Sequence, residues 1–423
     1  MRPRSPLEGE PIRLVRYVLR WTVLGTIVGV LAGLSSAALL TTLTWATDRR
    51  VASPWLLYLL PLGGFLVGLG YHYLGGRAAT GNALIIEEIH EPVAWVPRRM
   101  APLVFAGTVA TQLLGGSAGR EGTAVQMSGS LTDGFSRLVR LRYSERRLML
   151  IAAIAGGFGA VFGVPVAGCV FALEVQAVGR MRYDALVPAL TASFVGDLVV
   201  RSVGVEHFAQ PQLAKYDLGV GLAAKVAVAG LVFGLVSVAF TRLVHAIRRI
   251  LAATVTWPPA RPLIGGLAVI GLTLVVGNRD YLGLSLPLAE RATAGGAGII
   301  AGAFALKLVF TAVTVGAGFQ GGEVTPLFVI GATLGVTMAR VVDVPIPLLA
   351  AIGLVAVFAG AANTPLACTV MGAELFGGGA ITLFAIGCVM SYVFSSHAGI
   401  YHTQRVDVPK RPATLTDQSD RSN

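Results

Sequence analysis

Two glutamates occupy equivalent places in a repeated motif, each on a glycine-rich break just before an apolar run. The first motif reads Ser-Ala-Gly-Arg-Glu-Gly-Thr and contains Glu121, and the second reads Phe-Gln-Gly-Gly-Glu-Val-Thr-Pro and contains Glu323. A threonine follows each glutamate two positions later, so the pairs Glu121/Thr123 and Glu323/Thr325 recur 202 residues apart. An ionisable side chain inside a hydrophobic segment is costly and usually marks an ion or proton pathway. A buried carboxyl group that alternates between its ionised and protonated forms would couple a proton to the movement of another ion.

A second pair of motifs repeats in the same way. Three residue types recur at an offset of 200 residues, namely Phe158 and Phe358, Pro165 and Pro365, and Glu174 and Glu374. This agreement in one register indicates an internal repeat, although the pattern alone does not distinguish parallel from inverted halves. We expect Glu174 and Glu374 to be structural, either satisfying helix ends or pairing with arginines.

The composition indicates a polytopic all-α membrane protein. Of the 423 residues, 54% are apolar and 13% are charged, whereas a soluble domain carries about 25% charged residues. Uncharged stretches such as residues 21–46 are long enough to span a bilayer as helices. We predict a cytoplasmic segment at residues 1–20, repeats at 21–209 and 210–402, and a cytoplasmic tail at 403–423.

The net charge of +11 comes from arginines and lysines clustered at the ends of apolar segments. This placement predicts a positive-inside orientation with both termini in the cytoplasm. Nucleic-acid binding is disfavoured because we expect no basic stretch to be interleaved with exposed aromatic residues. Glu87 and Glu88 are expected toward a surface. The three cysteines and the histidines have no metal-ligand spacing, so neither a metal nor a cofactor is expected.

The glycine-rich breaks predict broken helices within the membrane. Such breaks are tolerated where the freed backbone groups line a polar cavity. The free N–H groups and positive dipole ends of helix N-termini favour an anion there. The alternative interpretation of each glycine cluster is close packing between membrane helices.

At these residues the chain resembles the CLC family of chloride channels and proton-coupled anion antiporters. The segment from Gly119 to Thr123 is similar to the family's Gly-Arg/Lys-Glu-Gly-Pro motif, in which the glutamate is the external gate. The segment ending at Tyr401, Ala-Gly-Ile-Tyr, aligns with the one that supplies the central pore tyrosine. The resemblance covers residues 20–402 and implies two inverted-topology repeats, a homodimer and one anion pathway per subunit.

Several departures from the common pattern are similar to the fluoride-transporting branch of that family. Asn82 stands where a pore serine is usual, and Thr123 replaces a proline. Glu323 and Thr325 enter the second motif, while Val175 stands where the common antiporters carry an inner proton-transfer glutamate. The resemblance implies fluoride export from a bacterium in exchange for protons, which would give fluoride resistance at the inner membrane.

The candidate residues fall into two groups. Glu121 and Glu323 are expected to carry or gate protons. The structural alternative for Glu121 is an ion pair with Arg120, and the alternative for Glu323 is a side chain that is only hydrated in a cytoplasmic vestibule. For Asn82 the alternative is an N-cap of the following helix, and for Tyr401 an interfacial aromatic residue. The residues expected to bind the anion are Asn82, Gly119, Arg120, Gly122, Thr123, Gly322, Val324, Thr325 and Tyr401.

These residues favour one function over three others. A fluoride/proton antiporter in contact with membrane lipid is favoured, and a chloride/proton antiporter or passive anion channel of the same fold is the main alternative. An intramembrane enzyme is disfavoured because the chain has no His-Glu-x-x-His motif and no pair of aspartates at membrane depth. A cation transporter is disfavoured by the positive field at the helix breaks.

Overall fold

The computed structural model describes residues 10–207, 210–397 and 399–410, and these residues are mainly helical. The α-helices are α1 (Glu10–Ala52), α2 (Leu60–Gly70), α3 (Asn82–His90), α4 (Met100–Leu113), α5 (Glu121–Leu138), α6 (Tyr143–Phe162), α7 (Pro165–Glu174), α8 (Leu186–Ser202), α9 (Val220–Thr254), α10 (Ala260–Val276), α11 (Leu286–Thr293), α12 (Ala303–Gly316), α13 (Val324–Val342), α14 (Ile346–Ala362), α15 (Pro365–Phe376) and α16 (Ile381–Phe394). Short helical turns are η1 (Pro54–Leu59), η2 (Tyr71–Gly75), η3 (Gly76–Thr80), η4 (Tyr183–Ala185) and η5 (Gly378–Ala380), and two short strands, β1 (Ala177–Val178) and β2 (Arg405–Val406), pair in parallel.

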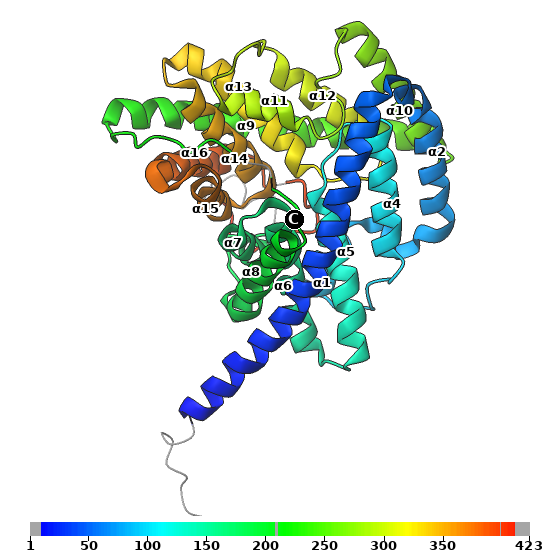
Figure 1. Ribbon diagram of the computed structural model, residues 1–423, viewed down its shortest axis with the longest axis vertical. Coiled ribbons are helices and arrows are strands. Elements are labelled where there is room, and N and C mark those ends of the chain that lie inside the picture. Colours follow the sequence, from blue (N-terminus) through cyan, green and yellow to red (C-terminus); the bar gives the residue numbers. More distant parts are fainter. Residues whose placement is uncertain (1–9, 208–209, 398, 411–423) are drawn as a thin grey trace, which may run out of the picture.

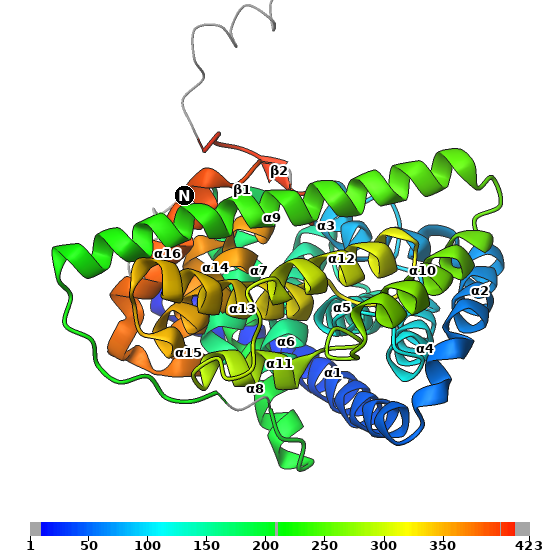
Figure 2. The ribbon, with the colours of Figure 1, turned by 90° about the horizontal axis from the view of Figure 1, so that it is seen from above.

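The lengths of the helices fit a protein that spans a membrane with some broken segments. Five helical stretches among the described residues are long and apolar enough to cross a bilayer, from the 42-residue Pro11–Ala52 to the 19-residue Val324–Val342. Other apolar helices have only 10–17 residues. In Figure 1 the N-terminal turns of α1 extend beyond the other helices, and in Figure 2 α9 runs along one face of the bundle.

The two halves are inverted with respect to each other, and the matched glutamates reveal it. Glu374, near the end of α15, accepts hydrogen bonds from the backbone N–H groups of Val166 and Ala167 at the start of α7, at 3.0 and 2.7 Å. Glu174, the last residue of α7, caps the start of α15 in the same manner at 3.1 and 2.8 Å. Each helix end therefore lies beside the other helix's beginning, so α7 and α15 are antiparallel. The expectation that these glutamates satisfy helix ends is confirmed.

The turns that lead into these helices also repeat. Gly163 ends α6 and Asn363 ends α14, both with left-handed backbone at φ 71° and 60°. Glycine and asparagine are the residues that adopt this conformation at helix C-termini with least strain. The matched Phe158 and Phe358 then stack on each other with ring centroids 6.1 Å apart. The repeat seen in the sequence is thus a contact between the two halves in the core.

Candidate functional site

Both motif glutamates lie at the beginning of a helix, where backbone N–H groups are free. Glu121 is the first residue of α5, and Glu323 is the N-cap of α13. The two motifs are joined by reciprocal backbone hydrogen bonds between Gly119 and Gly322, at 2.6 and 2.8 Å in an antiparallel bridge. A Cβ atom at Gly119 would lie 2.9 Å from the carbonyl oxygen of Gly322, so this approach requires glycine. The bridge brings the starts of α5 and α13 together.

The Glu121 carboxylate is held by donors from both repeats. The side chain is 1% exposed, and the Thr325 hydroxyl donates to its Oε1 atom. Its Oε2 atom accepts the backbone N–H groups of Arg120 and Thr325, both at 3.1 Å. Three donors around a buried carboxylate form a position that suits an anion, and here the side chain itself occupies it.

A cavity of about 650 Å³ lies on one side of Glu121. It is lined by six of the residues expected from the sequence, Asn82, Gly122, Gly322, Glu323, Val324 and Tyr401, together with Gln126, Arg248 and His245 among others. The start of α5 borders this cavity through Gly122, and Arg120 lines a second cavity of about 490 Å³. Glu121 itself lines neither cavity, but its two neighbours in the chain, Arg120 and Gly122, line different ones.

Asn82 is the first residue of α3, and Gly81 with φ 69° is the N-cap. Its amide is close to α5, because a Cβ atom at Gly122 would lie 2.6 Å from Asn82 Nδ2. No side-chain capping hydrogen bond is present at this helix end. The N-cap alternative for Asn82 is therefore wrong, and the amide is directed toward the start of α5 beside the cavity.

Glu323 and Tyr401 reach the same cavity from different elements. Glu323 is partly buried, and its carboxylate makes no hydrogen bond within the described part of the chain. Tyr401 packs edge-on against Phe171, with ring centroids 6.2 Å apart. Its segment is anchored by Gln404, whose Nε2 donates to the backbone oxygens of Val175 and Ala362 at 3.1 and 3.2 Å. Gln404 thereby ties the tyrosine to both repeats.

Thr123 and Thr325 occupy equivalent sequence positions but have different partners. The Thr123 hydroxyl is 2.7 Å from the Thr108 hydroxyl on α4, and Thr123 lines neither cavity. Thr325 instead holds Glu121. The ion-pair alternative for Glu121 is also weak in geometry, because Arg120 Nε lies 3.8 Å from its carboxylate.

We expect the Thr325→Val variant to lower the number of protons moved per fluoride. Valine keeps the shape but removes a hydrogen bond to a charged group, worth about 1.5–3 kcal/mol. The Glu121 side chain would then leave its buried position more readily. The measurement is the ratio of initial proton and fluoride fluxes in liposomes. The matched control is Thr123→Val, which removes the hydrogen bond to Thr108 and should leave the proton-to-fluoride ratio unchanged. The same ratio in the Thr325→Val and Thr123→Val variants would contradict the role of Thr325.

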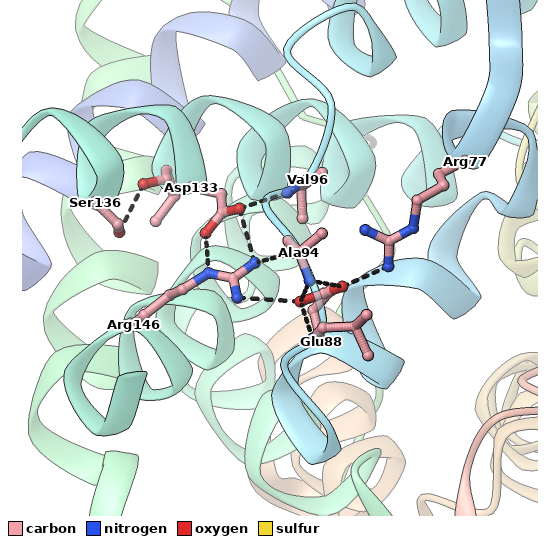
Figure 3. A network of polar contacts seen from close by, with 9 residues as sticks. Arg77, Glu88, Ala94, Val96, Asp133, Ser136 and Arg146 are labelled. Carbon is pink, nitrogen blue, oxygen red and sulfur yellow. Dashed lines mark hydrogen bonds and ion pairs between the residues drawn. The ribbon is translucent and has the colours of Figure 1, made fainter. Parts of the chain in front are cut away.

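A buried ionic network that the sequence interpretation missed holds α3 in place (Figure 3). Arg146 lies between two carboxylates, with contacts of 2.5 and 2.9 Å to Asp133 and 3.0 Å to Glu88. Arg77 donates to the other oxygen of Glu88 at 2.5 Å. Because α3 begins at Asn82 and carries Glu88 near its end, this network fixes the helix that presents the asparagine.

The expectation for Glu88 is wrong. Glu88 is 1% exposed, whereas the adjacent Glu87 is exposed. Arg146, which belongs to a basic cluster at the end of an apolar segment, is also 1% exposed. Neighbouring residues on a helix point in different directions, and only tertiary packing decides which of them is covered. Among the described residues no group of three or more His, Cys, Asp or Glu side chains could hold a metal ion.

Comparison with known proteins settles the family. Residues 63–396 match the model of the voltage-gated chloride channel family. The chain belongs to this family. A curated member from Pseudomonas syringae pv. tomato, a "Chloride/fluoride channel protein", is 44% identical over 97% of this chain and 91% of its own length. The family resemblance inferred from the motifs is thus confirmed.

Two solved structures of the family are similar to this chain. The crystal structure of a CLC-type fluoride/proton antiporter has a TM-score of 0.89 and 34% identity, covering 92% of this chain and 98% of the other. A slow cyanobacterial Cl⁻/H⁺ antiporter has a TM-score of 0.75 at 20% identity, covering 90% and 94% of the two chains, and shows the shared fold. The expected CLC fold of two inverted repeats with broken helices is confirmed.

Proposed function

We propose that this chain exchanges fluoride for protons across a membrane and exports fluoride from the cell. The observation that carries the proposal is the Glu121 carboxyl group, which is buried and held by Thr325 at a point where its chain neighbours Arg120 and Gly122 line different cavities. The relative named for chloride and fluoride and the structural neighbour named as a fluoride/proton antiporter support the choice of fluoride. Fluoride resistance of the host would follow from export.

The proposed cycle uses the two states of Glu121. When ionised, the side chain occupies the position formed by the Thr325 hydroxyl and the two backbone N–H groups, and it blocks the path. When protonated, it loses much of its attraction for these donors and leaves, so that an anion takes the position. One proton is therefore bound for each time the anion path opens.

The other site residues have proposed roles that follow from their places. Glu323 carries the proton between Glu121 and the 650 Å³ cavity, because it lines that cavity. The Asn82 amide and the Tyr401 hydroxyl supply donors that replace water around a small, strongly hydrated anion. The backbone N–H groups of Gly122 and Val324 act at the helix starts, which the Gly119–Gly322 bridge holds together. Arg120 attracts the anion from the second cavity.

The assembly and orientation are also proposals. Residues 21–209 and 210–402 form the two repeats, and segments 1–20 and 403–423 flank them in the cytoplasm. The boundary at residue 20 lies inside α1, which is continuous from Glu10 to Ala52. We infer a homodimer in the bacterial inner membrane, as implied by the family, with lipid around the exposed apolar helices. The 650 Å³ cavity then faces the cytoplasm, because Arg248 from a basic cluster and His402, next to the proposed cytoplasmic tail, both line it.

Purified protein in liposomes tests the proposed function directly. The liposomes are loaded with fluoride or chloride in turn, and an ion-selective electrode follows anion efflux while a pH electrode follows protons. Fast fluoride efflux with opposing proton uptake, and slow chloride efflux, is the expected result. Comparable fluxes of both anions would indicate a general anion transporter, and anion flux without proton movement would indicate a passive channel.

The Glu323→Ala variant is expected to stop proton movement through the protein. The variant removes the carboxyl group that lines the 650 Å³ cavity, so that protons on Glu121 have no acceptor on that side. The proton flux per folded protein should fall by about 100-fold, within the usual range for removing a proton-transfer group. The isosteric Glu323→Gln variant should have the same defect. If either variant only lowers expression and retains proton flux, Glu323 is structural.

A further inference from the structure

Lys307 is a buried lysine on α12 that the proposed cycle does not use. Its Nζ atom lies at hydrogen-bond distance from four uncharged oxygens: Ser117 Oγ at 2.9 Å, Tyr281 O at 3.2 Å, Gly283 O at 2.8 Å and Ser285 Oγ at 2.9 Å. Two of these are carbonyl oxygens, which only accept, and an ammonium group supplies three donors. Lys307 therefore connects the loop that precedes Glu121 with the loop of residues 281–285.

Both loops border the second cavity, which is cationic at its inner end. The 490 Å³ cavity is lined by Arg50, Arg120 and Ser285, while Lys307 lies behind its wall. The Arg120 side chain is only 10% exposed, and the Nε atoms of Arg50 and Arg120 are buried without a hydrogen-bond partner in the part of the chain that the structure describes. The remaining charged groups, Asp48, Arg279, Asp280 and Glu290, are exposed at its rim.

The inner cations lack protein carboxylates to neutralise them. Among the described residues, no carboxylate lies within 4.0 Å of a side-chain nitrogen of Lys307 or Arg50, and Arg120 has only Glu121 at 3.8 Å. Buried charges without a partner are strongly unfavourable in a medium of low dielectric constant. Several such cations around one cavity are stabilised when an anion enters it. Screening by water is weak at this depth, so the attraction is larger than at the surface.

We propose that this cavity is an anion-binding site for a small monovalent anion such as fluoride or chloride. Arg120 and Arg50 are its direct ligands, and Lys307 positions the two loops of its wall through the four contacts of Nζ. The site is separate from the Asn82 cavity, because the two cavities share no lining residue. Its use as the place where the anion arrives after passing Glu121 rests on the proposed transport function, whereas anion binding itself does not.

The binding test uses the purified full-length chain, titrated with sodium fluoride and with sodium chloride in a calorimeter. We expect Arg50→Gln to weaken one class of anion site by about tenfold, the effect of losing one close, poorly screened charge, and Lys307→Met to weaken the same site by releasing the two loops. The matched control is Arg49→Gln. It removes a charge from the exposed residue that precedes Arg50 in α1, and it should change the anion affinity less than about twofold. Wild-type anion affinity in Arg50→Gln would overturn the proposal. If Lys307→Met does not fold, the affinity of Arg50→Gln alone tests the anion site.

A transport test separates this inference from the proposed function. Right-side-out and inverted membrane vesicles present opposite faces of the protein to the medium. The fluoride concentration for half-maximal flux should rise about tenfold in Arg50→Gln in only one vesicle type, since the site opens to one side. Equal effects in both types would overturn a one-sided site. Wild-type vesicles without fluoride/proton exchange would contradict the proposed function, and the calorimetric titration would still decide whether the anion site exists.

Discussion

The Glu121→Gln variant is expected to lose proton transport and to leave anion movement either blocked or uncoupled. Glutamine has nearly the shape of glutamate, and its carbonyl oxygen can still accept the N–H groups of Arg120 and Thr325, while its NH₂ group can donate to the Thr325 hydroxyl. The side chain can therefore remain in its buried position. It cannot bind and release a proton, so the step that links the proton to the anion is removed.

The measurement follows proton and fluoride fluxes in the same liposome preparation. The proton flux should fall by at least about 100-fold, the usual effect of removing a group that transfers a proton. Glu87→Gln is a suitable control because it makes the same chemical change at an exposed glutamate on α3. Unchanged coupled proton flux in Glu121→Gln would remove this residue from the mechanism. A fluoride leak without protons would instead show that the amide leaves the position that the carboxylate holds.

Both glutamates of the site could be predicted because each is a local anomaly. An ionisable residue after glycines and before an apolar run is costly in a membrane wherever the rest of the chain packs. The repeat strengthened this inference, since Glu121 and Glu323 share one spacing to a threonine. The different partners of Thr123 and Thr325 were not predictable. They depend on contacts between segments: α4 lies beside α5 and places Thr108 against Thr123, whereas Thr325 contacts Glu121.

The same local rule also applied to a residue that the sequence interpretation passed over. Lys307 is the one charged residue in the apolar segment 303–316, so it carried a signal comparable to that of Glu121. Arg146 carried a weaker signal, because it belongs to a run of arginines that is typical of a membrane edge. Neither the inversion of the repeats nor the burial of Glu88 was visible locally. Both depend on contacts between segments far apart in the chain, such as Glu174 with Ala367.

The Arg146→Met variant is expected to have the largest effect on stability. Methionine fills part of the volume but leaves two carboxylates, those of Asp133 and Glu88, buried without the guanidinium group between them. Removing one partner of a buried ion pair costs about 3–5 kcal/mol, because the charge that remains is poorly solvated. The backbone N–H of Val96 and the Arg77 side chain still contact these carboxylates, but neither replaces the three contacts of Arg146.

Thermal or denaturant unfolding of the purified protein in detergent measures this loss. Arg147→Met is the matched control, since it removes the same charge from the next residue of α6, which makes no ion pair among the described residues, and we expect less than about 1 kcal/mol. Near-wild-type stability of Arg146→Met would contradict the network as an anchor of α3. A variant that folds but binds fluoride more weakly would instead show that the network acts through Asn82, because the helix that carries Glu88 begins at that residue.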